Sequence, residues 1–502
     1  MRFLLDTNIL IGREDYKITP PDVQDMFRYG ILAKIQFLVH SVSVQDIERD
    51  KNEQRREILL AKIKAYPLLE SPCLPDFNAD PEFFQKIGYP QKPQDYVDST
   101  LLYSVYKNAV DFLISEDQRL HRKAKKLSIA RRVLHIDDAV SYFRNLLPKN
   151  KVSAPPAVKN TYVHNLNIAD RFFDSLKRQY PEFEEWFENI SRQGRKCFVF
   201  WRLDGTIGGL LIYKIEEEPV EATPRFLPKK RRLKLCTFKV EHTGYKLGEL
   251  FIKLAIEYSV VNRIDEMYLT CFEKGNDRLI DLITEYGFIK CGTNSRGESV
   301  FLKKLVPAIE DIHNLSPFEI DTRFYPTFYD GEKVNKYIIP IRPEYHERLF
   351  IEYPRTPTLW ESVGEFIIEG NAIKKAYLCH SRIRAIKQAD IIFFYRSHDM
   401  QKLTCMGIVH EVYPGLTDKD EIMKLVAKRT VYSEEEIAKI AKKPTLVILF
   451  TLNFYLPESL ELKNLIEMGI IRSAPRSILQ ISHDKYLKIK KESGIDVRFT
   501  IN

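Results

Sequence analysis

The segment Phe3-Leu4-Leu5-Asp6-Thr7-Asn8-Ile9-Leu10 opens the chain with a short apolar run that ends at an acid. The pattern returns at 112–117, which reads Phe-Leu-Ile-Ser-Glu-Asp. Each run has the length and composition of a buried strand, and segment 1–147 alternates such strands with amphipathic helices. This alternation predicts a parallel α/β sheet. Because ligands bind at the carboxyl ends of strands in open α/β sheets, two strands that end in acids predict one shared crevice.

The overall composition predicts a multidomain globular protein. A chain of 502 residues is too long for one ordinary core, and its 44% hydrophobic content can fill two to four domains. The formal net charge is +8, a mild excess that suits a polyanionic partner without demanding one.

The seven cysteines are far apart and include no Cys-x-x-Cys pair, which is typical of small buried residues in a reducing compartment. The N-terminus lacks the pattern of a signal peptide, and no apolar run reaches the length of a membrane span. We therefore expect a cytoplasmic protein with no membrane partner.

Two proline-marked joints divide the chain, one at 148–156 and one at about 306–336, where little helical periodicity is present. They predict domains at 1–147, 157–305 and 336–502. In the second domain, apolar runs at 197–203 and 206–215 flank Asp204-Gly205, a strong hairpin signal. A strand at 232–240, a helix at about 248–262 and a strand at 267–272 follow. The third segment mixes strands such as 391–395 and 446–450 with helices, which predicts an α+β domain or small barrel.

Four acids in the first domain lie at the edges of apolar segments: Asp6, Asp46, Asp98 and Asp117. Each has an ordinary explanation, because Asp6 suits a turn, Asp117 a helix cap, and Asp46 and Asp98 the beginning of a helix. Together they have the character of carboxylates that hold divalent metal ions against a phosphodiester.

This pattern resembles the PIN domain, a family of metal-dependent nucleases that act mostly on RNA. The resemblance covers about 1–145 and places Asp6, Asp98 and Asp117 on the family's acidic positions. The second position, usually Glu, falls on Asp46, with Glu48 and Asp50 as competitors. Asn8 and Ser115 match polar positions that support the cluster.

The resemblance implies Mg²⁺- or Mn²⁺-assisted hydrolysis of RNA, with the four acids as catalytic and metal-binding residues. A basic stretch follows the last acid and is either a solvated face or a contact for the nucleic-acid backbone. Its members are Arg119, His121, Arg122, Lys123, Lys125, Lys126, Arg131 and Arg132.

Segment 160–305 resembles the GNAT acetyltransferases. The resemblance rests on two segments: 237–250, which reads as a strand, a glycine turn and a helix, and 282–288. The resemblance implies an acetyl-CoA site with the cofactor-binding residues Val240, Thr243, Gly244, Lys246, Gly248 and Asn276. Thr243 replaces the family's Arg or Gln, Lys246 replaces a Gly, and Ile283 stands where the family commonly has a catalytic Tyr. Tyr286 is close but in another register. A scaffold used only for structure or binding is the alternative.

Segment 336–502 is weakly similar to the PUA-like superfamily near the ASCH group, small barrels often associated with RNA. The similarity rests on 341–350, 389–396 and 406–412, where Gly407 would allow a close approach in the barrel wall. Basic and aromatic residues interleave nearby and suit RNA contact or an ordinary surface. They are Tyr377, His380, Arg382, Arg384 and Lys387.

The leading interpretation is a metal-dependent endoribonuclease with RNA as partner. The resemblance to the PIN family, together with the other two domains, suggests a toxin or stress effector with a cognate inhibitor (antitoxin) protein. The PIN resemblance also suggests self-association into a homo-oligomer. Two alternatives are an N-acetyltransferase that uses acetyl-CoA and a non-catalytic RNA-binding protein.

Overall fold

The computed structural model describes the chain except for 10–20, 50–52, 64–65, 70–73, 77, 79, 147–156, 203, 242–245, 274–277, 354–364, 368–371, 427–428 and 430. The predicted linker 148–156 lies outside the described residues. The chain divides into two compact units. The first comprises Met1–Lys151, His242–Lys246 and Asp418–Lys439, and the second comprises Val152–Glu241, Leu247–Thr417 and Ile440–Asn502. Segments 157–305 and 336–502 both contribute to the second unit, and their division into separate domains stays a prediction.

A four-stranded parallel sheet forms the centre of the first unit, in the order β2-β1-β3-β4. Its strands are β1 (Arg2–Leu5), β2 (Gln36–Leu38), β3 (Phe112–Ile114) and β4 (Val133–Leu134). The parallel α/β prediction for this segment is thus confirmed. The apolar runs at 3–5 and 112–114 are fully buried, as expected for strands of a parallel sheet. Because β1 and β3 are adjacent and parallel, the residues that follow them meet at one edge.

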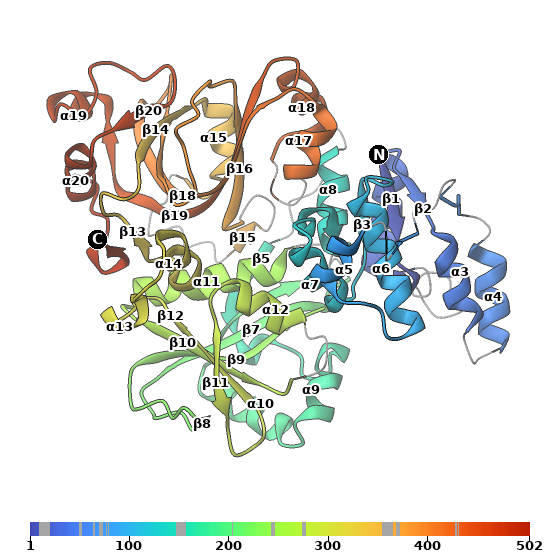
Figure 1. The fold of residues 1–502 in the computed structure, drawn as a ribbon. Helices are drawn as coiled ribbons and strands as arrows, with labels where there is room; N and C mark the ends of the chain where they lie inside the picture. Colours follow the sequence, from blue (N-terminus) through green and yellow to red (C-terminus); the bar gives the residue numbers. More distant parts are fainter. Residues whose placement is uncertain are drawn as a thin grey trace. The chain divides into compact units, whose positions relative to one another are not determined.

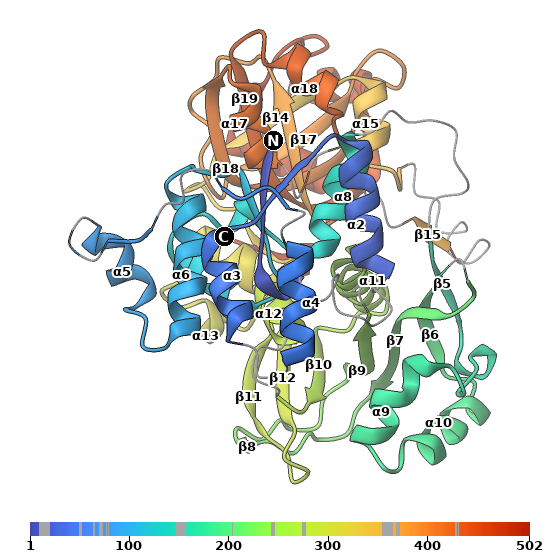
Figure 2. The same cartoon turned by 90° about the vertical axis from the view of Figure 1, so that its right-hand side faces the viewer.

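Helices surround this sheet. α2 (Pro21–Leu32) lies beside α8 (Ile136–Leu146), as Figure 2 shows, and α3 (Ser41–Glu48) lies beside α4 (Glu53–Ile63) (Figures 1 and 2). α5 (Pro81–Ile87), α6 (Pro93–Tyr106) and α7 (Gln118–Lys126) complete the layer, and a short 3-10 turn, η1 (Ala130–Arg132), precedes β4.

The first unit also contains a helical insertion from far along the chain, α17 (Lys419–Val426) and α18 (Glu434–Ile440). Lys424 Nζ lies 2.6 Å from Asp111 Oδ1, and the other carboxylate oxygen accepts the Arg2 amide at 2.9 Å. Burial raises the pKa of Asp111, but these contacts outweigh it and hold the pKa below its usual value. No sequence signal assigned this insertion to the N-terminal sheet.

The second unit contains a nine-stranded sheet in the order β15-β5-β6-β7-β9-β10-β12-β11-β8. Only the β9–β10 pair is parallel among the described pairings. The strands are β5 (Ala157–Tyr162), β6 (Lys196–Trp201), β7 (Ile207–Glu216), β8 (Thr223–Pro224), β9 (Arg232–Val240), β10 (Glu266–Cys271), β11 (Ile289–Thr293), β12 (Ser299–Lys304) and β15 (Glu365–Ile367). The predicted hairpin and the two predicted strands are confirmed.

Helices cover both faces of this sheet (Figure 1). α10 (Phe183–Arg192), preceded by α9 (Asp174–Gln179), packs its Phe183, Phe187 and Ile190 against β6 and β7. α11 (Leu247–Val261) and α12 (Arg278–Glu285) lie on the other face, where a Cβ at Gly209 would meet Leu247 at 2.3 Å. The helix predicted at 248–262 is therefore confirmed.

The joint at 306–336 contains two short helices, α13 (Ile309–Ile312) and α14 (Pro317–Phe324), so the expectation of little helix there is wrong. The beginning of α14 has a local cause. Ser316 accepts the Glu319 amide while the Glu319 carboxylate accepts the Ser316 amide, a capping box that needs no long periodic pattern.

Segment 336–502 contributes a six-stranded mixed sheet, in the order β16-β19-β18-β17-β14-β20. Its strands are β14 (Lys336–Ile341), β16 (Lys374–Cys379), β17 (Ile391–Arg396), β18 (Lys402–Leu416), β19 (Thr445–Glu461) and β20 (Leu479–Ile481), with helices α15 (Pro343–Leu349), α19 (Leu462–Glu467) and α20 (His483–Glu492). The hydrogen-bonded order of the described strands is open, not a closed ring. Gly407 does allow a close approach, since a Cβ there would lie 2.4 Å from the Thr451 carbonyl oxygen.

Within the described ranges, no helix combines the length and apolar character that crossing a membrane requires.

Candidate functional site

Asp6 is the residue that follows β1, and the neighbouring strand fixes its backbone. Its amide donates to the Ile114 carbonyl at the end of β3, at 3.0 Å. Its carboxylate accepts a short hydrogen bond from the Ser115 hydroxyl and is only 3% exposed. The predicted supporting role of Ser115 agrees with this contact, whereas Asn8 is exposed.

Asp98 comes from α6 and is the most poorly compensated of the acids. It is the sixth residue of that helix, so the explanation that it begins a helix is wrong. The residue is 2% exposed. Among the described residues it accepts one long hydrogen bond, 3.4 Å from Gln94 Nε2. A buried carboxylate with so little compensation is costly.

Asp117 joins β3 to α7 and caps that helix, as its ordinary explanation predicts. Its Oδ1 accepts the Arg119 amide at 2.7 Å, and its own amide donates to Ser115 Oγ at 3.0 Å. The Arg119 guanidinium also contacts the carboxylate, with Nη2 2.9 Å from Oδ2.

Asp46 is the sixth residue of α3, and His40 is the N-cap of that helix. The prediction that Asp46 lies at the beginning of a helix is therefore wrong as well. Burial raises its pKa, which contacts with Arg49, Gln94 and Thr7 counteract. Gln94 thus links Asp46 to Asp98. Glu48 is exposed on α3, and Asp50 lies outside the described residues.

Burial and neighbouring acids perturb the ionisation of two acids from separate elements, Asp6 and Asp98. Burial raises the pKa of Asp6 from 3.8 to about 7, opposed by the Ser115 hydrogen bond and reinforced by the charges of Asp98 and Asp117. Burial and the charge of Asp117 raise the pKa of Asp98 to about 6, although Lys123 and Arg119 lower it. The site therefore brings carboxylates together in a position where solvent stabilises their charged forms only poorly.

The donor set of this acidic cluster (Asp6, Asp46, Asp98 and Asp117) is the chemistry that hard divalent cations prefer, since every ligand is a carboxylate oxygen. Asp98, buried and poorly hydrogen-bonded, fits such an ion. In the part of the chain that the structure describes, however, no three acidic, histidine or cysteine side chains stand close enough together to hold a metal ion.

The basic stretch after Asp117 divides into structural and exposed residues. His121 is buried, contacts the Ser115 carbonyl at 2.8 Å and stacks on His135. Arg132 donates to the Asp111 carbonyl at 2.8 Å and to Asn108. The cations that face solvent on α7 are Arg119, Arg122, Lys125 and Lys126, with Lys123 half-buried.

The predicted acetyl-CoA residues are described only in part. Thr243, Gly244 and Asn276 lie outside the described residues. Val240 ends β9 and is 37% exposed, and Lys246 directly precedes α11. A Cβ at Gly248 would lie 2.6 Å from Leu282 Cδ2, so this glycine allows α11 and α12 to pack closely. Ile283 is fully buried in α12.

The parallel strands of the nine-stranded sheet separate halfway along their length. Pairing between β9 and β10 ends at Leu235 and Leu269, although both strands continue. The register with β7 shifts at the same point, because Ile212 pairs with Thr237 and Tyr213 with Leu235, which leaves Cys236 as the extra residue of a β-bulge. Beyond Leu235 and Leu269, no pairing joins β9 to β10 among the described residues.

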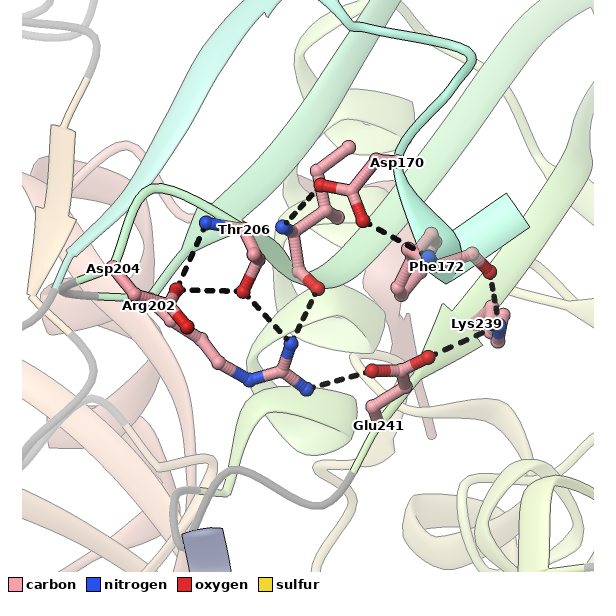
Figure 3. Close-up of polar contacts among 8 residues, drawn as sticks. Asp170, Phe172, Arg202, Asp204, Thr206, Lys239 and Glu241 are labelled. Atoms are coloured by element: carbon pink, nitrogen blue, oxygen red, sulfur yellow. Dashed lines mark hydrogen bonds and ion pairs between the residues drawn. The ribbon is translucent and has the colours of Figure 1, made fainter. Parts of the chain in front are cut away.

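A polar network that the sequence did not reveal fixes the end of β9 (Figure 3). Arg202 donates to the Glu241 carboxylate at 2.7 Å and to the Ile207 carbonyl at 2.8 Å. Lys239 donates to the Phe172 carbonyl, and its Nζ lies 3.3 Å from the Glu241 carboxylate. These charges compensate one another, which indicates a structural role.

The basic and aromatic set of the C-terminal segment divides into one buried tyrosine and four exposed basic residues. Tyr377 is buried and donates to the Pro340 carbonyl at 2.9 Å, so it is not placed to stack on a base. His380, Arg382, Arg384 and Lys387 are exposed.

No family model matches the chain, and no curated protein matches it. Solved structures give weak likenesses. An ASCH protein from Zymomonas mobilis is 12% identical over 31% of this chain and 94% of its own, with a TM-score of 0.24. A GNAT-family acetyltransferase from Listeria monocytogenes is 20% identical over 26% and 79%, with a TM-score of 0.21. The PaiA N-acetyltransferase from Thermoplasma acidophilum, in complex with coenzyme A, is 17% identical over 27% and 79%, at 0.20. These scores are too low to support an argument about function.

Proposed function

We propose that the first unit is a nuclease that uses Mg²⁺ or Mn²⁺ to hydrolyse RNA. The observation that carries the proposal is the acidic cluster at the carboxyl edge of the parallel sheet. Three of its carboxylates come from the end of β1, from α6 and from the β3–α7 junction. Burial, with the charges of Asp98 and Asp117, raises the pKa of Asp6, and burial with the charge of Asp117 raises the pKa of Asp98. Toxin activity, a cognate inhibitor and self-association stay predictions.

Ionising these buried carboxyl groups is costly. A pKa raised from 3.8 to about 7 means that the ionised form of Asp6 is destabilised by about 4 kcal/mol relative to a solvated carboxylate. Asp98 carries a similar but smaller cost. A chain that needs only a helix cap or a turn does not require this arrangement. A divalent cation would offset the repulsion between the carboxylates. Cation binding would therefore explain why the acids are buried together.

In this proposal Asp6 and Asp98 would hold the cation, with Asp117 and Asp46 at its border. The ion would supply a water of lowered pKa and neutralise charge on the scissile phosphate. Ser115 orients Asp6 and holds the Asp117 amide. The exposed cations of α7 begin two residues after Asp117 and would hold the phosphate backbone. The choice of RNA over DNA rests on the family resemblance.

The test is cleavage of a labelled single-stranded RNA by the full chain with Mn²⁺ or Mg²⁺. We expect cleavage that EDTA stops and that falls at least a hundredfold in Asp6→Asn and in Asp98→Asn. Asp420→Asn, which removes an exposed carboxylate from α17 in the same unit, is the matched control. Cleavage that survives both site substitutions would refute the assignment. RNA binding without cleavage would favour the non-catalytic alternative.

A second candidate function, acetyl transfer from acetyl-CoA, is favoured by the separation of β9 from β10 at the Cys236 bulge. Two parallel strands that separate within a sheet can admit a ligand between them. The absence of a Tyr at position 283 weighs against transfer by the family's usual acid. Calorimetry with acetyl-CoA tests this candidate, and no binding at millimolar cofactor would leave the nine-stranded sheet with a structural role.

A further inference from the structure

Segment 317–327 comprises α14 and the residues that follow it, and it falls in the joint that the prolines mark at 306–336. Its polar side chains are not those of a solvated linker. Asp321 is 1% exposed, and Thr327 and Tyr325 are also buried. A buried polar group is costly unless it has a hydrogen-bond partner, so the partners of these groups show what the segment does in the fold.

On one side the segment is bonded to the nine-stranded sheet. The Thr327 hydroxyl donates to the Leu305 carbonyl, directly after β12, at 2.5 Å. Lys303, a fully buried residue of β12, donates from Nζ to the Arg323 carbonyl at 3.3 Å. A Cβ at Gly287, just before β11, would collide with that same carbonyl. The end of α14 is therefore in direct contact with the β11–β12 part of this sheet.

On the other side the segment is bonded to the six-stranded sheet. The Tyr325 hydroxyl donates to the Leu452 carbonyl of β19 at 2.7 Å. Asn453, the next residue of β19, donates from Nδ2 to Asp321 Oδ1 at 3.0 Å and to the Pro326 carbonyl at 3.2 Å. These residues are all buried. The same segment is thus hydrogen-bonded to both sheets.

The Asp321 carboxylate also interacts electrostatically with basic groups of both sheets. Its Oδ2 lies 3.5 Å from Nε2 of His410, on β18. Burial lowers the pKa of Lys303, on β12, to about 7, and the charge of Asp321 counteracts this effect. A buried carboxylate needs such compensation. Both sheets therefore supply groups that stabilise one acid of the segment.

We propose that segment 317–327 couples the two sheets, so that they behave as one cooperative body and a local opening of either sheet at this segment also loosens the other. Opening either contact would leave buried donors and acceptors without partners, which costs more than each hydrogen bond contributes in place. A linker between independent domains would instead expose its polar groups to water. The coupling requires no metal ion, RNA or acetyl-CoA, and its test is therefore independent of the proposed function.

Hydrogen exchange of the full chain, followed for peptides from β12 and from β19, measures such openings. Tyr325→Phe removes the donor to β19, and Thr327→Val removes the donor to the residue after β12. Each change deletes one hydroxyl with little change in shape. We expect the opening equilibrium of the nearby sheet to rise about 5- to 150-fold. We expect the other sheet to exchange faster as well, namely β12 in Tyr325→Phe and β19 in Thr327→Val.

Tyr377→Phe is the matched control, because it deletes the same kind of hydrogen bond inside one sheet. The Tyr377 hydroxyl donates to the Pro340 carbonyl at 2.9 Å, and both residues belong to the six-stranded sheet. Exchange should rise near β14 and β16 and stay at the wild-type rate in β12. Thermal melting verifies that each variant is folded. Should one of the two segment variants fail to fold, the other tests the same coupling from the opposite side.

Faster exchange in both sheets for Tyr325→Phe and for Thr327→Val, with the control confined to its own sheet, is the result that the coupling predicts. Faster exchange confined to β19 in Tyr325→Phe and to β12 in Thr327→Val would overturn it, since the sheets would then open independently. Unchanged exchange in both sheets, or a rise in β12 for Tyr377→Phe equal to that for Tyr325→Phe, would overturn it too.

Discussion

Replacing Asp6 with Asn should stabilise the metal-free protein, and it should do so more strongly as the pH rises. The carboxylate is 3% exposed, and its pKa in the folded state is about 7 against 3.8 in an unfolded chain. Between these values the folded protein binds the proton more tightly than the unfolded chain, so wild-type stability falls as pH rises. Asparagine has the same shape, can still accept from Ser115 and does not ionise.

The magnitude follows from the two pKa values. Ionisation linked to Asp6 destabilises the wild type by about 1.7 kcal/mol at pH 5 and about 4.3 kcal/mol at pH 8. The stability difference between Asp6→Asn and wild type should therefore shift by about 2.6 kcal/mol in favour of the variant from pH 5 to pH 8. Comparing the two pH values cancels any effect of asparagine that does not titrate.

The assay is urea unfolding of both proteins in EDTA at the two pH values, with Asp420→Asn as control. The control should show no shift of this kind, since Asp420 is exposed. A stability difference for Asp6→Asn that stays constant between pH 5 and pH 8, or changes in the opposite direction, would refute the account of a buried, repelled carboxylate.

Three further predictions follow from contacts outside the cluster. Lys424→Glu should destabilise the protein by about 1 kcal/mol in urea unfolding, because it places like charges at Asp111, and Asp111→Lys in the same chain should recover much of the loss. Gly407→Ala should cost about 1–3 kcal/mol in thermal unfolding, because its Cβ would lie 2.4 Å from the Thr451 carbonyl; an unchanged melting temperature would contradict this. Arg202→Gln should weaken acetyl-CoA binding, if calorimetry detects any, and leave RNA cleavage unchanged, since it removes the 2.7 Å contact to Glu241 at the end of β9.

Local patterns predicted the strands and the helix cap at Asp117. The apolar run before Asp6 and the run before Asp117 became adjacent parallel strands, because short buried runs have few alternatives in an alternating α/β segment. The hairpin at Asp204-Gly205 and the strand at 232–240 were equally visible, since turn chemistry and alternation are encoded locally.

Contacts between distant segments were not predictable in this way. Gln94 lies beside Asp98 and Asp46 only once α6 and α3 pack together. Asp46 and Asp98 were placed too near helix N-termini, because the helices begin five residues before each of them. The docking of Lys424 against Asp111 joins residues more than three hundred positions apart, which no spacing in the sequence indicates.

The most direct test of the acidic cluster is the rate of RNA cleavage as a function of Mn²⁺ concentration, with Mn²⁺ binding measured in the same samples of wild type and Asp98→Asn. The account predicts that wild-type cleavage rises in parallel with occupancy of a Mn²⁺ site, and that Asp98→Asn loses both the site and the cleavage while staying folded. Equal Mn²⁺ binding and equal cleavage in the two proteins would contradict it.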